Sequence, residues 1–197
     1  MLDLILNAIS SKEKDELITN GSKMLGIPSN KAENAMGSAA AILMNALQRN
    51  SNNSDGRQSL ENALNRDHDG SVLDNIGSLL SNPSSGSGAG ILRHILGNKQ
   101  SMIESFLSKE NGISKSSSSN LLKMVAPIVM GMIGKQFKSQ RGSRSNVNSL
   151  LSMLTGSMEK QAPKNQSMIE QLLDSDGDGS IIDDIANIGM SFLKNKR

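Results

Sequence analysis

The apolar residues of this chain come in pairs that repeat every four positions, and this spacing predicts helices. Because a helical turn takes 3.6 residues, positions four apart share one face, so each set of pairs forms an apolar stripe. The clearest sets are Ile91-Leu92 with Ile95-Leu96, Met102-Ile103 with Phe106-Leu107, Met168-Ile169 with Leu172-Leu173, then Leu121, Leu122, Val125, Val129, Met132 and Ile133, and finally Ile42, Leu43, Ala46 and Leu47. No stretch alternates apolar and polar residues with β-branched or aromatic enrichment, as strands do. We therefore predict an all-α fold, an array of short helices of about two to four turns.

Three polar segments separate the predicted helices. Residues 82–90, NPSSGSGAG, form the clearest connector, and residues 50–57 form a second. Residues 135–148 carry four basic side chains and no acidic one, so we expect a basic, flexible insert there.

Sliding the chain against itself reveals a weak internal duplication. The matches are Gly26-Ile27 with Gly112-Ile113 and residues 39–44 with 125–130, both at an offset of 86, and residues 67–76 with 176–185 at an offset of 109. The offset grows by 23 residues, which an insertion in the second half explains. We predict two homologous helical halves, residues 1–81 and 91–197, which share one core because each alone would bury little apolar area.

The composition narrows the function classes. The 197 residues include no Cys, Trp or Tyr, and only two His and three Phe. The absence of Cys excludes disulfides and thiolate nucleophiles. The few aromatic residues argue against a surface on which nucleic-acid bases stack. A formal charge of +2 gives no global field for nucleic acid. The longest apolar stretch, Met124–Gly134, is far shorter than the roughly 20 residues of a membrane span. The first residues lack the features of a secretory signal, and we expect a cytoplasmic protein beginning with a helix.

Four motifs in order resemble the YidB-like bacterial proteins of unknown function. They are RDHDGSVLDN at 66–75, GAGILRHILGNKQ at 88–100, APIVMGMIGKQ at 126–136 and DSDGDGSIIDDI at 174–185. The resemblance implies a small cytoplasmic protein folded as an array of helices, and it implies no reaction.

The strongest chemical signal is the second acidic loop, residues 174–185. Its carboxylates at positions 1, 3 and 5 and its Gly at position 6 match the opening of a calcium loop. Position 12, where a bidentate Glu completes the coordination, is Ile185, so Asp183 or Asp184 would have to substitute. The Ca²⁺ ligand candidates of this loop are Asp174, Asp176, Asp178 and Asp183.

The first acidic loop, residues 65–76, offers a weaker version of the same set. Its Ca²⁺ ligand candidates are Asn65, Asp67, Asp69 and Asp74. Helix capping explains the same pattern without an ion, because Ser71 and Asp74, like Ser180 and Asp183, have the Ser-x-x-Asp spacing of a helix start. We favour capping for both loops, and more strongly for the first.

Three other features have a chemical and a structural interpretation. His68 and His94 suggest a transition-metal site with Asp67 and Asp69, although a polar role in a helical protein is the simpler interpretation. The glycines of residues 82–90 resemble a phosphate-binding turn, but no strand precedes them, and close helix packing at Gly88 and Gly90 explains them better. The many methionines suit core gaps, and also surfaces that accept partner helices.

We conclude from the sequence that the protein is a non-enzymatic helical binding or scaffold protein, with other proteins as its partners. The sequence requires no cofactor, and the one that its acidic loops favour is Ca²⁺. One alternative is a divalent-metal enzyme built on the second acidic loop. Another is weak nucleic-acid binding through the basic insert, which we consider the less favoured because Phe137 is its one aromatic residue. A homo-oligomer is compatible with the sequence.

Overall fold

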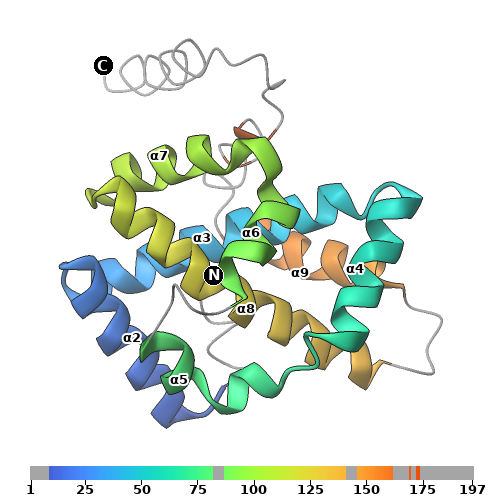
Figure 1. The fold of residues 1–197 in the computed structure, drawn as a ribbon, viewed down its shortest axis with the longest axis horizontal. Helices are drawn as coiled ribbons and strands as arrows, with labels where there is room; N and C mark the ends of the chain where they lie inside the picture. Colours follow the sequence, from blue (N-terminus) through green and yellow to red (C-terminus); the bar gives the residue numbers. More distant parts are fainter. Residues whose placement is uncertain (1–8, 82–86, 141–145, 162–168, 170–171, 174–197) are drawn as a thin grey trace.

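The computed structural model describes residues 9–81, 87–140, 146–161, 169, 172 and 173, and within them it contains helices and no strand. The all-α prediction is therefore confirmed. In chain order the elements are α2 (Ser11–Leu25), α3 (Ser29–Asn50), α4 (Ser54–Arg66), the short 3₁₀ helix η1 (Ser71–Asp74), α5 (Ile76–Ser81), α6 (Gly88–Leu96), η2 (Gly97–Lys99), α7 (Gln100–Asn111), α8 (Lys115–Ser139) and α9 (Val147–Gln161) (Figure 1).

Two long helices, α3 and α8, form the centre of the fold. They contain 22 and 25 residues, so the predicted limit of four turns was wrong for both. Residues 39–47 of α3 and 124–134 of α8 are buried on every face, as expected of helices that are apolar all round. The two buried runs contain residues 39–44, AAAILM, and residues 125–130, VAPIVM, which the sequence aligns with each other.

The remaining helices cover this central pair. Helix α2 packs on α3, α7 packs on α8, and α3 and α8 pack on each other. Helices α4 and α6 both lie against α8, and α5 packs on α2. The buried apolar residues from both predicted halves form one core cluster.

The corner between α2 and α3 has a well-defined cap. Gly26 ends α2 with a φ of 67°, a left-handed conformation that glycine adopts without strain. The Ser22 hydroxyl donates a hydrogen bond of 2.6 Å to the Ile27 carbonyl and ties the two helices together. The residues 86 positions later in the chain are Ser108, Gly112 and Ile113.

These later residues repeat the cap between α7 and α8. The glycine has a φ of 64°, and the serine hydroxyl again donates to the isoleucine carbonyl at 2.6 Å. Both following helices also begin 86 positions apart, at Ser29 and Lys115. The two helical hairpins therefore share a local geometry, while the duplication of the whole halves stays a prediction.

Helix α8 passes through Pro127 without a break. Proline has no N–H group and cannot donate to the carbonyl four residues earlier, which belongs to Lys123. Gly88, at the start of α6, lies against that carbonyl so closely that a Cβ atom at position 88 would overlap it. The predicted role of Gly88 in close helix packing is thus confirmed, whereas a Cβ at Gly90 would meet no atom within 4 Å.

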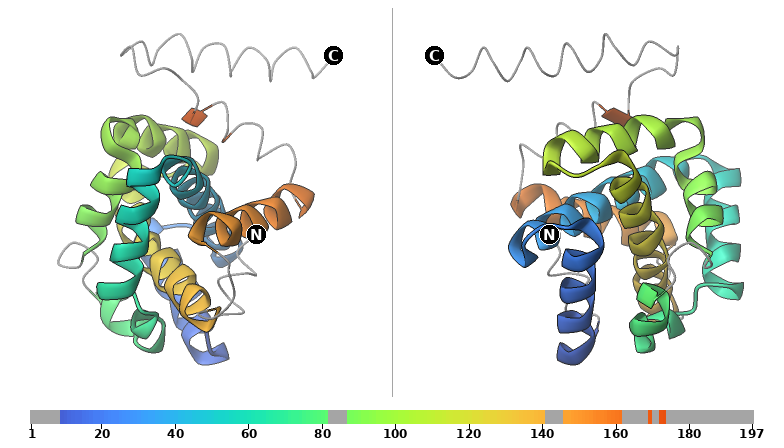
Figure 2. Two further views of the ribbon diagram at one scale, coloured as in Figure 1. Left: turned by 90° about the vertical axis from the view of Figure 1, so that its right-hand side faces the viewer. Right: turned by 60° about the vertical axis from the view of Figure 1, so that its left-hand side comes forward.

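The predicted connectors are shorter than expected. Helix α4 already begins at Ser54 and α6 at Gly88, so parts of the 50–57 and 82–90 segments are helical. The prediction for the basic insert was wrong at both ends, since α8 continues to Ser139 and α9 starts at Val147. One reason is Phe137, because its side chain packs against the core and so favours the continuation of α8 through this segment. Helix α9 lies beside α3 and α4 (Figure 2).

The expected helix at the start of the chain is described only from residue 9 onward, because residues 1–8 lie outside the described residues. Ser10 caps α2, because its hydroxyl accepts from the Glu13 N–H while the Glu13 carboxylate accepts from the Ser10 N–H. A helix therefore begins at Ser11, within the segment that the sequence predicts to be helical. None of the helices in the described ranges combines the length and the apolar character that crossing a membrane requires.

Candidate functional site

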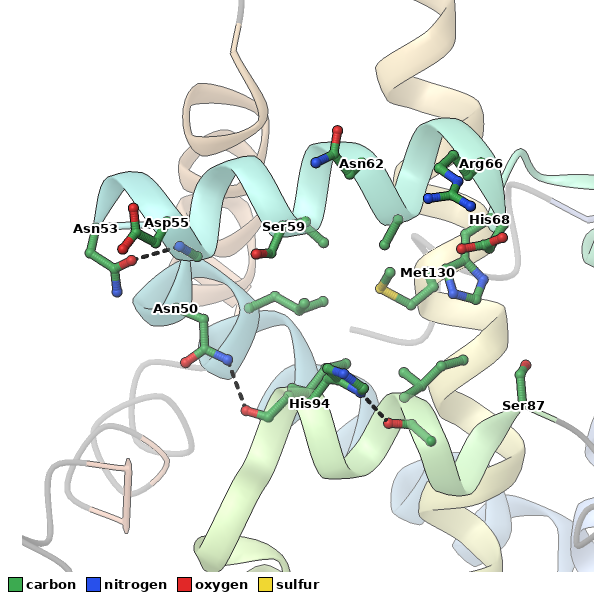
Figure 3. A pocket seen from close by; sticks show the side chains of 18 residues that line it. Asn50, Asn53, Asp55, Ser59, Asn62, Arg66, His68, Ser87, His94 and Met130 are labelled. Atoms are coloured by element: carbon green, nitrogen blue, oxygen red, sulfur yellow. Dashed lines mark hydrogen bonds between the residues drawn. The ribbon is translucent and has the colours of Figure 1, made fainter.

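A groove of about 1080 Å³ lies between α4 and α6. The two helices run antiparallel and form its walls, and α8 and the end of α3 lie beneath it (Figure 3). Its floor is apolar and consists of Leu47, Leu60, Ile91, Ile95 and Met130. Leu60 and Ile91 are each 8% exposed, so these floor side chains lie just below the surface of the groove.

The rim of the groove is polar. Its larger polar side chains are Asn50, Asn53, Asp55, Ser59, Asn62, Arg66, Asp67, His68 and His94. An apolar floor with a few polar groups around it is typical of sites that bind ligands or peptide segments.

The end of the groove at the start of α4 is fixed by two amides. The Asn53 side chain accepts a hydrogen bond of 2.6 Å from the Gly56 N–H and caps α4. The Asn50 side chain donates one of 2.9 Å to the Ile95 carbonyl and so joins the end of α3 to α6. Asp55 lines the groove at this end.

The opposite end carries His68, whereas His94 projects from the α6 wall nearer the middle of the groove (Figure 3). His68 is half-buried beside Met130, and this burial lowers the pKa of its ring, while the Asp67 carboxylate partly opposes the shift (Figure 3). His94 is exposed, and its Nδ1 lies 2.9 Å from the Gly90 carbonyl oxygen, one turn earlier in α6. The structure therefore brings both histidines and Asp67 to one groove.

The transition-metal hypothesis gains no support from this arrangement. Nowhere in the described part of the chain do three or more His, Asp or Glu side chains gather closely enough to hold a metal ion. Asp69, the other expected ligand, does not line the groove.

The weaker calcium candidates are spread along the first acidic loop. Asn65 lies in the last turn of α4, Asp67 follows the end of that helix, and Asp74 is the last residue of η1. The Asp69 carboxylate accepts a hydrogen bond of 3.0 Å from the Ser71 N–H, and Gly70 has a φ of 100°. This region therefore forms a turn held by one of its own carboxylates.

The capping prediction for Ser71 and Asp74 was wrong in detail. Gly70 occupies the cap position of η1, and no side chain caps that helix. The carboxylate two residues before Ser71 does the equivalent work, because Asp69 forms a local turn with the Ser71 backbone.

The first acidic loop is pressed onto α8. Cβ atoms at Gly131 and Gly134 would overlap the Val72 side chain and the His68 carbonyl, so these two glycines let the loop approach. Lys138 of α8 forms an ion pair of 3.5 Å with Asp69. The hydrogen bonds from Ser71 and then the charge of Lys138 lower the pKa of Asp69 to about 2.

Several predicted residues lie outside the described residues. They are the calcium candidates Asp174, Asp176, Asp178 and Asp183, and the cations Arg141 and Arg144 of the predicted basic insert. Of the insert's described cations, Lys135 and Lys138 belong to α8, and Lys138 pairs with Asp69.

The sequence did not point to the amide and hydroxyl groups of the rim. Asn50 and Asn53 fall in the segment predicted as a connector, and Ser59 and Asn62 carry no motif. Their common signal would have been their place at the end of one helix and along one side of the next. Only the packing of α3, α4 and α6 on α8 reveals this place.

The chain matches the family model of a bacterial protein family of unknown function, DUF937, over residues 7–136. The match covers more than half of the chain, and the chain therefore belongs to this family. YidB belongs to it too, so the resemblance seen in the motifs is confirmed. No curated protein and no solved structure matches the chain.

Proposed function

We propose that this DUF937 family member is a non-enzymatic binding protein whose groove between α4 and α6 holds a helical segment of a partner protein. The observation that carries the proposal is the apolar floor between two antiparallel helices. Amphipathic helices commonly bind in such grooves by inserting an apolar face.

The dimensions of the groove support a helical segment as the ligand. Helix α4 contains 13 residues and so gives the wall a length of about 20 Å. A partner helix of three to four turns has the same length, and packed helices approach to about 8–10 Å. The floor side chains Leu60, Ile91 and Ile95 would meet the apolar stripe of such a helix.

The polar rim supports binding rather than catalysis. Hydrogen bonds occupy the Asn53 carbonyl oxygen and the Asn50 amide nitrogen, which hold the scaffold together. His94 is bonded within its own helix. These bonds between described residues hold the ends and the rim of the groove in place. A groove held in place in this way favours the recognition of a partner segment.

Photo-cross-linking in the bacterium that makes the protein tests this function. A benzophenone side chain would replace Ser59, on the groove side of α4, or Gln58, which does not line the groove. We expect the Ser59 position to label one partner on a peptide with apolar residues at helical spacing, and the Gln58 position to label none.

Two tryptophan variants make the result specific. Gly90→Trp fills the groove from a position whose Cβ meets no atom within 4 Å, and Gly156→Trp adds the same side chain at an equally open position on α9. Labelling should be lost in the first variant and retained in the second. Equal labelling from positions 58 and 59, or labelling that persists in Gly90→Trp, would refute the groove as the binding site.

A further inference from the structure

Gly90, on the α6 wall of the groove, has no side chain at a point where the fold has room for one. We infer that Gly90 is a specificity-determining residue, which leaves space for a bulky apolar side chain of the bound segment, such as leucine, methionine or phenylalanine. This inference rests on the proposed function, and it adds the size and the chemistry of the side chain that the groove selects at this point.

The two neighbouring glycines of this segment have structural reasons. Gly88 lies against the Lys123 carbonyl, and a Cβ atom at position 88 would overlap it. Gly97, which follows α6, has a φ of 53°, a backbone conformation that residues with a side chain rarely adopt. The fold therefore requires glycine at both positions.

Gly90 has neither of these reasons. It is exposed, it is not one of the described glycines with a positive φ, and a Cβ atom added to it would meet no atom within 4 Å. Glycine lowers the stability of a helix relative to alanine, because its backbone loses more conformational freedom on folding. For the fold alone, alanine would thus be the better residue at position 90.

The missing side chain leaves a gap in the groove face of α6. Ser87 lies three positions before Gly90 and His94 four positions after it, so the three residues follow one side of the helix, and all three line the groove (Figure 3). The row of side chains along this wall therefore opens at Gly90, between a hydroxyl group and an imidazole ring.

The surface next to this gap is apolar. Gly90 lines the groove together with the following residue, Ile91, and with Met130, which lies between the two walls (Figure 3). Both are buried apolar side chains, and methionine adapts its shape to different neighbours. A bulky apolar side chain that enters the groove here would cover apolar surface, whereas a polar one would lose hydration without a matching hydrogen bond.

Alanine at position 90 separates the needs of the fold from those of binding. Gly90→Ala should raise the melting temperature by about 1–4 °C, as should Gly156→Ala at an equally open position outside the groove lining. Photo-cross-linking from the benzophenone at position 59 should fall roughly fivefold or more in Gly90→Ala, because the methyl group occupies the gap, and should stay unchanged in Gly156→Ala. Unchanged cross-linking in a stabilised Gly90→Ala protein would overturn the inference.

A peptide selection tests the size and the chemistry of the bound side chain. Purified wild-type protein and Gly90→Leu would each select from a phage-displayed library of peptides of about 14 residues, in which the positions of a stripe at helical spacing are randomised. We expect wild type to enrich leucine, methionine or phenylalanine at one stripe position, and Gly90→Leu to enrich alanine or glycine there. Gly156→Leu is the control and should select the same residues as wild type.

The selection distinguishes a failure of this inference from a failure of the proposed function. If wild type and Gly90→Leu select the same side-chain sizes, or if wild type enriches polar residues at every stripe position, the inference is overturned while peptide binding itself stands. If wild type selects no peptide, or if the selected peptides still bind Gly90→Trp, the proposed function fails.

Discussion

The first acidic loop and the groove lie next to each other but differ in how they use their space. In the loop, Gly134 of α8 lies against the His68 backbone and Gly131 against the Val72 side chain. Asp69 contacts both Ser71 and Lys138. In the groove, α4 and α6 stand apart over Leu60 and Ile91, and the space between them is open. The two regions meet at Asp67 and His68.

This difference shows that the closely spaced carboxylates, which are conspicuous in the sequence, have a structural role in the first loop. Its carboxylates drew attention because of their spacing, yet Asp69 stabilises a turn and its docking on α8. The open site is built from a plain apolar floor and from neutral amides and hydroxyls. In this chain, therefore, the carboxylates of the first acidic loop stabilise a turn between helices, whereas the packing of α3, α4, α6 and α8 forms the groove.

The largest effect should come from filling the close contact at the loop. Gly134→Ala places a methyl group against the His68 carbonyl and should cost about 1–3 kcal/mol of unfolding free energy, even though alanine is the better helix former. Gly156→Ala is the control, since a Cβ there meets no atom within 4 Å, and it should stabilise by about 0.5–1 kcal/mol. Urea unfolding of both variants measures the difference. A Gly134→Ala protein as stable as the Gly156→Ala protein would show that the loop does not need this close approach.

The sequence allowed the fold class, the family and the packing role of Gly88 to be predicted. These depend on local patterns, because apolar spacing fixes helices and a glycine at a helix start permits close approach. It failed where tertiary contacts decide, as in the length of α8, since Phe137 is apolar but surrounded by polar residues that suggested a loop. The groove was missed for the same reason, because residues 67–87 separate its walls α4 and α6 in the chain and no motif connects Ser59 with Ile91.

A smaller effect should follow from removing the charge of Asp69. Its pKa is lowered from 3.8 to about 2 in the folded protein, so its ionised form stabilises the fold above pH 4 and this contribution is lost between pH 4 and pH 2. Asp69→Asn should therefore lower the melting temperature at pH 6, and the difference from wild type should shrink as the pH falls to 2. Asp15→Asn, at an exposed position of α2, is the control. A difference that stays constant from pH 6 to pH 2 would contradict the role of the Ser71 and Lys138 contacts.

The pH dependence of stability at His68 tests the groove, the second of the two regions compared. Burial lowers the pKa of its ring below 6.5, so the neutral ring stabilises the fold at higher pH and this contribution is lost as the pH falls below 6.5. We expect His68→Gln to lose less stability than wild type between pH 7.5 and pH 5, as measured by thermal unfolding. His94→Gln, with an exposed ring on the opposite wall, should behave like wild type. If both variants follow the same pH dependence, the burial of His68 in the groove does not affect the pH dependence of stability.

The smallest effect concerns calcium, and it compares the two acidic loops. The first loop has a carboxylate already bound to Ser71 and Lys138, and its described residues do not converge on a metal. The second loop has one more carboxylate among positions 1, 3 and 5, so any calcium bound by this protein should depend on it. In calorimetric titration, Asp176→Ala should abolish the weak heat of Ca²⁺ binding and Asp67→Ala should leave it unchanged. Loss of the heat in Asp67→Ala would mean that the first loop opens to hold the ion. Identical flat traces for wild type and both variants would leave both loops with a structural role and no ion.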